Sequence, residues 1–233
     1  MTFSVHQPQY IPWLGYFDKI AKSDYFVFLD SVQYKPREFQ NRNKIRTKKG
    51  SSWLTVPAIC KGKRCQMIRD VIIDNSQPWQ RKHLNSIKES YATSPFFKDY
   101  IPFFENVYSR KWERILDLNV YIIKYILEKI HIRTPVCLES QLGTKNTATY
   151  RIVEIAKKLN ADTYLSGIGG KDYLEEEKFA DNGIKIIYQN FTHPVYHQQF
   201  MPNENDFIPY MSILDLLFSE GHKAKRVLEL EGV

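Results

Sequence analysis

Residues 2–29 have the sequence TFSVHQPQYIPWLGYFDKIAKSDYFVFL, which carries the strongest architectural signal of the chain. Residues 2–6 predict a short strand, and residues 12–22 predict a helix whose large apolar side chains recur at helical spacing. Residues 25–29 are continuously apolar, which is typical of a strand buried on both faces of a parallel sheet. The segment therefore predicts a right-handed βαβ unit and an α/β fold class.

The same alternation returns in the second half of the chain. Strands are predicted at 136–138, 162–165 and 184–188, and helices at 147–159, 178–182 and 212–219. Between the two halves we expect a hairpin of residues 43–47 and 52–57, a short strand at 71–73, and helices at 79–91, 100–108 and 114–130. The pattern predicts a single α/β domain spanning 1–233, with a three-layer Rossmann-like, mostly parallel sheet. Residues from about 31 to 130 form a basic hairpin and helical insert within it.

Composition narrows the class of protein. The chain has 233 residues and is 43% hydrophobic, yet it holds no run of 18 apolar residues, so no membrane span is expected. The N-terminus lacks the basic region and cleavage site of a signal peptide. The three cysteines, Cys60, Cys65 and Cys137, are odd in number and lack metal-ligand spacing. We therefore expect a cytoplasmic protein without a metal site.

A formal net charge of +7 indicates an anionic partner. The basic residues crowd one region and comprise Lys35, Arg37, Arg42, Lys44, Arg46, Lys48, Lys49, Lys61, Lys63 and Arg64. Aromatic residues interleave with them, which keeps nucleic acid open as a partner, but no recognised nucleic-acid fold signature accompanies them. A phosphate-rich small molecule is the more economical interpretation, and the alternatives are an anionic membrane face and a solvated loop surface.

The turn after the first strand is the first candidate site. His6 ends that strand, and the turn holds two prolines and several aromatic residues at the first βα junction, where α/β folds bind ligands. The candidate residues of this turn are His6, Gln7, Tyr10, Trp13 and Tyr16. The alternative is a turn that only ends a strand and starts a helix, with Tyr10 and Trp13 in the core.

Two further candidates follow the second strand. Asp30 stands at the strand's carboxyl end, where a carboxylate points into the crevice of an α/β sheet, and Gln33 follows it. The run Gln40-Asn41-Arg42-Asn43 offers amide and guanidinium groups for a polar, anionic ligand, and Arg42 could grip a phosphate. A local cap for Asp30 and a polar loop for residues 40–43 are the alternatives.

The last candidates lie after the later strands. The loop Ser166-Gly167-Ile168-Gly169-Gly170-Lys171 follows a strand, and Ser166, Gly167 and Lys171 are candidates to bind phosphate or carboxylate. After the last strand, His193, Tyr196 and Gln198 are candidate substrate contacts. Pro194 makes a helical metal pair of His193 and His197 unexpected. Asp215 lies in an apolar helix and needs a partner if it is buried.

Several of these motifs, in this order, resemble the WbqC-like family of bacterial proteins. The matching segments are the turn His6-Gln7-Pro8-x-Tyr10-x-Pro12-Trp13-x-Gly15-Tyr16, Leu29-Asp30-x-Val32-Gln33, Gln40-Asn41-Arg42-Asn43, Tyr164-Leu165-Ser166-Gly167 and Ser212-Ile213-x-Asp215-Leu216-Leu217 with Gly221. The resemblance spans nearly the whole chain. It implies a link to bacterial surface polysaccharides, notably O-antigen synthesis, and a role in attaching an amino acid such as glycine to an amino sugar.

A weaker resemblance concerns the start of the fold. A first strand, a histidine-bearing turn, a helix and a second strand look like the start of the nucleotidylyltransferase group, which includes pantothenate synthetase and uses ATP. The chain departs from that group because no His-x-Gly-His follows the first strand, and only His6 matches one of the two histidines. The departure puts the use of ATP in doubt.

These observations together favour an enzyme that forms an amide on a dTDP-linked amino sugar. In this hypothesis Arg42, Lys44 and Arg46 hold phosphates, the aromatic turn stacks a base or sugar, and His6 or Asp30 is the general base. The expected partners are the nucleotide-linked amino sugar and an amino acid or activated donor, with ATP and Mg²⁺ as a possible cofactor. Nucleic acid is expected only as an aminoacyl-tRNA donor. The alternatives are a nucleotidylyltransferase- or glycosyltransferase-like enzyme of the same pathway and a non-catalytic nucleic-acid or assembly protein.

Overall fold

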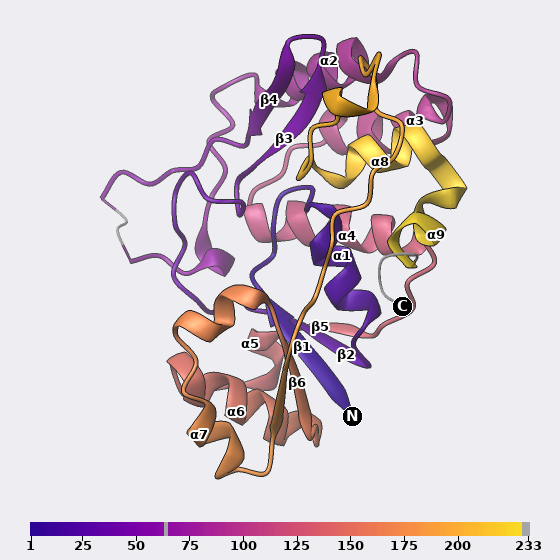
Figure 1. Cartoon of the computed structure of the whole chain (residues 1–233). Coiled ribbons are helices and arrows are strands. Elements are labelled where there is room, and N and C mark those ends of the chain that lie inside the picture. The colour runs from indigo at the N-terminus through magenta and orange to yellow at the C-terminus, as the bar shows by residue number, and fades with distance from the viewer. Residues whose placement is uncertain (63–64, 230–233) are drawn as a thin grey trace.

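The computed structural model describes residues 1–62 and 65–229, and a five-stranded parallel sheet forms its base (Figure 1). Its strands are β1 (Thr2–His6), β2 (Tyr25–Phe28), β5 (Val136–Leu138), β6 (Thr163–Ser166) and β7 (Lys185–Tyr188). They lie in the order β5-β2-β1-β6-β7, and each neighbouring pair is parallel. This order confirms the Rossmann-like α/β fold expected from the buried apolar runs.

The order of strands along the chain changes direction at the central strand, β1. From β1 the chain moves outward to β2 and β5, and it then returns to the other side of β1 to add β6 and β7. Loops that leave the carboxyl ends of β1 and β6 therefore diverge to opposite faces. This topological switch point is where open α/β sheets bind ligands.

Alternation of side chains along β2 divides the core between the two faces of the sheet. Phe3 and Val5 pack with Val27 of β2 against α6 (Ala148–Leu159) and α7 (Glu176–Ala180). Phe26 and Phe28 join the opposite, larger cluster with α1 (Leu14–Ala21) and α4 (Ile115–Lys129). The short α5 (Glu139–Leu142) follows β5 directly. Helices thus cover both faces of the sheet, which makes the three expected layers.

The segment between β2 and β5 includes the hairpin of β3 (Arg42–Thr47) and β4 (Gly50–Thr55), the 3₁₀ turn η1 (Ile68–Asp70), and the helices α2 (Trp79–Tyr91), α3 (Phe97–Ser109) and α4. The hairpin and the helices α2 and α3 lie at the end of the molecule opposite α7 (Figure 1). The second hairpin strand begins two residues earlier than expected. The strand expected at 71–73 is wrong, because this stretch makes only isolated bridges to Ala58 and Arg114.

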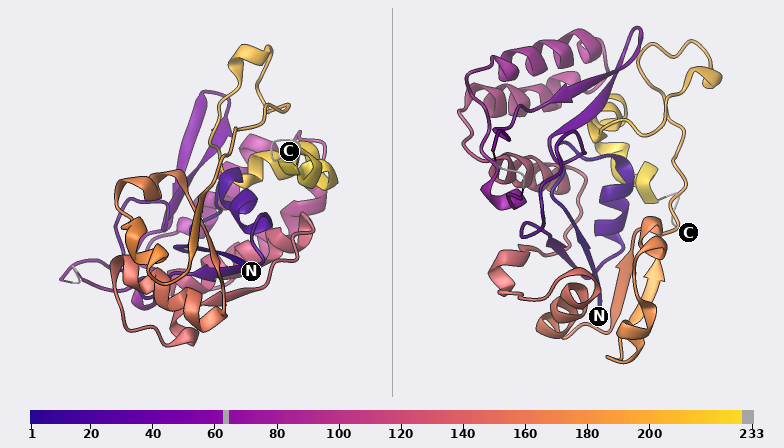
Figure 2. Two further views of the ribbon diagram at one scale, coloured as in Figure 1. Left: turned by 60° about the horizontal axis from the view of Figure 1, so that its bottom comes forward. Right: turned by 90° about the vertical axis from the view of Figure 1, so that its left-hand side faces the viewer.

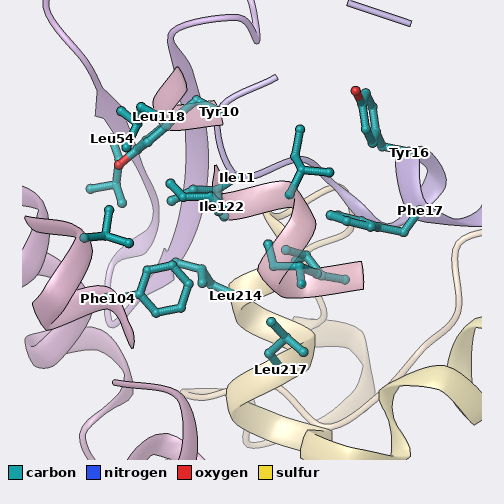
Figure 3. Packing of buried hydrophobic residues seen from close by; sticks show 14 of the residues in the cluster. Tyr10, Ile11, Tyr16, Phe17, Leu54, Phe104, Leu118, Ile122, Leu214 and Leu217 are labelled. Atoms are coloured by element: carbon teal, nitrogen blue, oxygen red, sulfur yellow. The ribbon is translucent and has the colours of Figure 1, made fainter. Parts of the chain in front are cut away.

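The turn after β1 is held in a strained conformation. Ile11 has a φ of 43°, which a β-branched residue rarely adopts. The Asn43 side chain donates a hydrogen bond of 2.7 Å to the Ile11 carbonyl, and the amide of Ile213 donates one of 2.8 Å to the Pro12 carbonyl. The Pro12 carbonyl is bonded to Ile213 and the Trp13 backbone is extended, so neither residue is helical. The helix α1 therefore begins at Leu14 and not at Pro12 as expected. Tyr10 and Ile11 pack into the core beside side chains of α4 and of α8 (Ile213–Glu220) (Figure 3).

Residues 189–212, which we call the strap, connect β7 with α8 (Ile213–Glu220). The strap leaves the sheet, passes the start of α1 and reaches the hairpin (Figure 2, right). Its one regular element is η3 (Glu204–Asp206), and η4 (Gly221–Lys223) with α9 (Ala224–Glu229) follow α8. Within the described ranges, no helix combines the length and apolar character needed to cross a membrane.

Candidate functional site

Two cavities meet at the switch point of the sheet. Their volumes are about 260 and 280 Å³, so each cavity alone is slightly smaller than a typical small-molecule site. His6 of β1, Lys19 of α1 and Gly167 after β6 line both of them. We call the pair the switch-point crevice, the cavity beside α1 the first cavity and the other the second cavity.

Aromatic and amide side chains surround the first cavity. Trp13 and Tyr16 come from the turn and α1, and Gln189 and Phe191 come from the start of the strap. The Trp13 indole meets the Phe191 ring edge-on, with centroids 5.4 Å apart. Gln189 donates a 2.6 Å hydrogen bond to the buried Asp18 and another to the carbonyl of Gly15, so the strap is fastened to α1 beside this cavity.

The second cavity lies toward α6 and has a more open, glycine-rich wall. Gly167, Gly169 and Gly170 line it together with Gln7 and Tyr164. The loop that carries these glycines forms a short 3₁₀ helix, η2 (Ile168–Asp172). Because glycine has no side chain, backbone atoms of this loop face the cavity.

His6 is placed to act as a proton acceptor. Its Nδ1 lies 3.1 Å from the Gln7 carbonyl oxygen, which can only accept a hydrogen bond, so Nδ1 carries the proton and Nε2 keeps its lone pair. Burial, reinforced by the nearby Lys19, lowers the pKa of His6 to about 3, although the hydrogen bond with Gln7 acts in the opposite direction. The imidazole is therefore neutral at physiological pH.

Lys19 is the site residue that sequence reasoning missed. Its side chain is almost fully buried, and its Nζ donates a 3.1 Å hydrogen bond to the Val5 carbonyl. Burial lowers the pKa of Lys19 to about 7. The available signal was its position one helical turn after Tyr16, on the buried face of a helix that follows the first strand.

Asp30 and Gln33 lie outside the linings of both cavities. Asp30 is buried, and its Oδ1 accepts a 2.9 Å hydrogen bond from the amide of Ser140 at the start of α5. Gln33 is exposed and forms an isolated bridge with Met67. The structure thus places Asp30 as a local anchor for α5.

The Gln40–Asn43 run supports the turn after β1. Asn41 donates a hydrogen bond to the Val56 carbonyl, and Asn43 donates one to the Ile11 carbonyl, so both amides serve backbone groups. Gln40 donates a 2.9 Å hydrogen bond to the side chain of Gln7, which lines the second cavity. The run therefore reaches the crevice only through Gln7.

The expectation that residues 42, 44 and 46 hold phosphates is wrong for Arg46. Its guanidinium is buried and donates to the backbone carbonyls of Gly50, Gln199 and Phe200. Arg42 stacks 4.2 Å from the Trp53 ring centroid, and Lys44 lies 5.0 Å from the same ring. Arg46 therefore bonds the strap, whereas Arg42 and Lys44 lie against the exposed Trp53. None of the three lines either cavity.

Three candidate side chains are enclosed in the core and bonded there. Tyr10 bonds His83 and Tyr108, which corresponds to the core alternative for this residue. Tyr196 donates a 2.9 Å hydrogen bond to Asp215, and Gln198 pairs with the backbone of Ile208. Because each is more than nine-tenths buried, these side chains do not offer a surface to a ligand.

Asp215 finds the partners that a buried carboxylate needs. Tyr91 and Tyr196 both donate hydrogen bonds to it, at 3.0 and 2.9 Å. Burial raises its pKa to about 6, while the two hydroxyl groups oppose that rise. This cluster fastens α2, the strap and α8 to one another.

Of the remaining candidates, His193, Ser166 and Lys171 do not line either cavity. His193 lies among aromatic residues of the strap, and its Nδ1 is 2.8 Å from the Pro194 carbonyl. Ser166 is buried and donates a 3.0 Å hydrogen bond to the Gly167 carbonyl. Lys171 is exposed, with its Nζ 5.0 Å from the Tyr188 ring. Of the loop candidates, Gly167 alone lines the cavities.

Gly15 makes room for a wall of the first cavity, because a Cβ at this position would overlap the Trp13 indole. We expect Gly15→Ala to displace that ring and shift the tryptophan emission of the folded protein. The measurement is the fluorescence difference between variant and wild type, repeated in a Trp13→Phe background. An equal difference in that background would contradict the displacement of Trp13.

Comparison with known proteins relates these features to a family. The model of the WbqC-like protein family matches residues 7–227, which begin one residue after His6 and include the turn, Lys19, the glycine loop and the strap. A Mycobacterium tuberculosis protein described as uncharacterized protein Rv1507c is 30% identical over 222 residues, which cover 95% of this chain and 94% of that protein. No solved structure gives a significant match.

Proposed function

We propose, since this chain belongs to the WbqC-like protein family, that it is an enzyme of bacterial surface-polysaccharide synthesis. Membership in this family suggests a polysaccharide-associated role. Our specific proposal is that the enzyme forms an amide between an amino acid, with glycine as the first candidate, and the amino group of a dTDP-linked amino sugar.

The meeting of two cavities at His6 is the observation that carries the proposal. Amide formation needs an acyl donor and an amine at one point, with a base between them. His6 lines both cavities and has an unprotonated Nε2. The aromatic wall of the first cavity suits the sugar or its base, and the glycine-rich wall of the second suits the donor.

The proposed reaction assigns His6 one task. An amino sugar attacks as the free amine, the fraction that has lost one proton to solvent. As this nitrogen bonds the activated carboxyl carbon it becomes strongly acidic, Nε2 of His6 would accept its second proton, and the leaving group departs with the electrons of its bond to carbon. A carboxylate must be activated first, and an adenylate made with ATP, a thioester and an aminoacyl-tRNA ester are the candidate donors.

Magnesium would enter this site bound to ATP and would not be coordinated by side chains of the protein. Among the described residues, no carboxylate lines either cavity, and no group of three candidate metal ligands occurs. The donor set of the crevice therefore fits a nucleotide that brings its own metal ion on its phosphates.

The test is a mass-spectrometric assay with purified protein. We would mix it with a dTDP-linked 4-amino-6-deoxy sugar, glycine and Mg-ATP, and then omit each component in turn. The expected product is the sugar nucleotide heavier by one glycyl residue. If omission of ATP abolishes it, the enzyme activates glycine itself.

Parallel reactions would supply a glycyl thioester or glycyl-tRNA in place of glycine and ATP. Product with one of these donors alone would identify a carrier-borne acyl group. Absence of any mass change with all three donors would contradict amide formation on this sugar. Release of free nucleotide or pyrophosphate without an amino acid would instead favour the glycosyltransferase- or nucleotidylyltransferase-like alternative.

A further inference from the structure

We infer that Lys19 is the oxyanion-binding group of the switch-point crevice and that it takes up a proton when the anion binds. The inference rests on the proposed function, since it names the charged group, a carboxylate or a phosphate, by which this site would recognise a substrate. It concerns binding alone and requires no chemical step.

The position of Lys19 makes it the cation of this site. Its side chain extends from α1 to the carboxyl end of β1, where Nζ bonds the Val5 carbonyl. In the part of the chain that the structure describes, it is the one lysine or arginine in either lining. A ligand in either cavity therefore meets the same ammonium group, and an ammonium has three N–H donors of which Val5 accepts one.

The groups packed around Lys19 leave its charge uncompensated. Asp18, its neighbour in α1, is paired with Lys22 at 2.8 Å and with Gln189 at 2.6 Å. From β1 the facing titratable group is His6, which is neutral. From α1 and β6 the groups are the phenols of Tyr16 and Tyr164, and burial raises both pKa values, so they are neutral as well.

The second cavity adds one further titratable group, the phenol of the exposed Tyr173 in the loop after β6. Burial raises the pKa of this phenol, so it too carries no charge at neutral pH. No carboxylate of the described residues faces the ammonium across the crevice. A buried cation without a counter-ion in a solvent-connected crevice is a site that favours an anion.

Proton uptake on anion binding follows from the burial of the Lys19 side chain. Burial lowers the pKa of Lys19 to about 7. With such a pKa, roughly a tenth of the molecules carry the proton at pH 8. An oxyanion beside Nζ favours the charged form, so binding at pH 8 should draw close to one proton from solution.

Calorimetry tests the inference without the proposed reaction. Sulfate, as a stand-in for phosphate that does not titrate near pH 8, and acetate, as a carboxylate, would each be titrated into the full chain at pH 8. Two buffers with different ionisation enthalpies report the protons taken up. We expect uptake with one of the anions, and its identity tells whether a phosphate or a carboxylate is bound.

Two variants separate charge from structure. Lys19→Met should weaken anion binding at least tenfold and abolish proton uptake, whereas Lys19→Arg should retain binding without uptake, because a guanidinium stays protonated. Lys157→Met, at an exposed position of α6, is the matched control and should behave as wild type. Absence of uptake with both anions in the wild type, or equal binding by Lys19→Met, would overturn the inference.

The result is separable from that of the amide assay. Amide formation by a protein that shows no linked proton uptake would refute the role of Lys19 and leave the proposed function standing. Anion binding with proton uptake in a protein that forms no amide would refute the proposed function and leave the role of Lys19 standing.

Discussion

Replacement of His6 by Gln is expected to lower the turnover of amide formation by about 10²–10⁴-fold, the usual contribution of a positioned general base. The glutamine amide stays polar and neutral but offers no basic nitrogen to the amine. The measurement is the rate of product formation at saturating substrate, with thermal unfolding to confirm that the variant is folded.

The pH profile provides an independent check on His6. A general base must be unprotonated, and the lowered pKa of about 3 keeps His6 in that form down to strongly acidic solution. Protonation of His6 should therefore cause no loss of kcat/KM near pH 6.5, where an ordinary histidine titrates. A loss of activity centred there that disappears in His6→Gln would contradict the environment assigned to this residue.

Asp30→Asn is the matched comparison, because Asp30 is the other candidate base. It lines neither cavity, and an asparagine oxygen can still accept the hydrogen bond of the Ser140 amide. We expect this variant to retain most of the turnover. If Asp30→Asn lost as much activity as His6→Gln, or if His6→Gln kept full turnover, the base would be misassigned.

Local sequence patterns were enough to predict the sheet. The apolar runs at β1 and β2, and the later strands at 136–138 and 163–166, are short and bounded by helical patterns, which is the arrangement that produces a parallel sheet. The stretch at 71–73 is equally apolar but pairs only through isolated bridges. Strand pairing depends on a partner distant in the sequence, and a three-residue apolar run does not reveal whether one exists.

The polar residues were harder to assign, because a sequence shows which groups are present and not where they point. Asn43 was a candidate ligand contact, but its amide is used to hold the strained carbonyl of Ile11. Lys171 sits in the glycine loop yet faces solvent, whereas Lys19, within an apolar helix, reaches the crevice. Packing decides such cases, since a buried polar group must find a partner.

Arg46 leads to the second large effect, on stability. Arg46→Met is expected to lower the free energy of unfolding by about 3–5 kcal/mol, because several hydrogen bonds from a charged donor are lost together and each is worth about 1.5–3 kcal/mol. The methionine fills much of the volume but donates nothing, so the carbonyls of Gln199 and Phe200 in the strap lose their donor. Chemical denaturation followed by circular dichroism measures the change.

Loss of the Arg46 charge should also change the pKa of Asp215. Arg46 helps to lower the pKa of Asp215, which burial raises to about 6. Without the guanidinium that pKa should rise further. A carboxyl group whose folded pKa exceeds its unfolded value favours the folded state as pH falls through that folded value. The deficit of Arg46→Met should therefore be larger at pH 8 than at pH 5.

Arg42→Met is the matched control for the structural role of Arg46. Arg42 lies four residues before Arg46 in the same strand, but its guanidinium stacks on the exposed Trp53 and lies outside the strap contacts. Because an exposed cation–π contact contributes only about 0.5–1 kcal/mol, this variant should unfold almost as the wild type does. Equal stability of the two variants would show that Arg46 does not hold the strap.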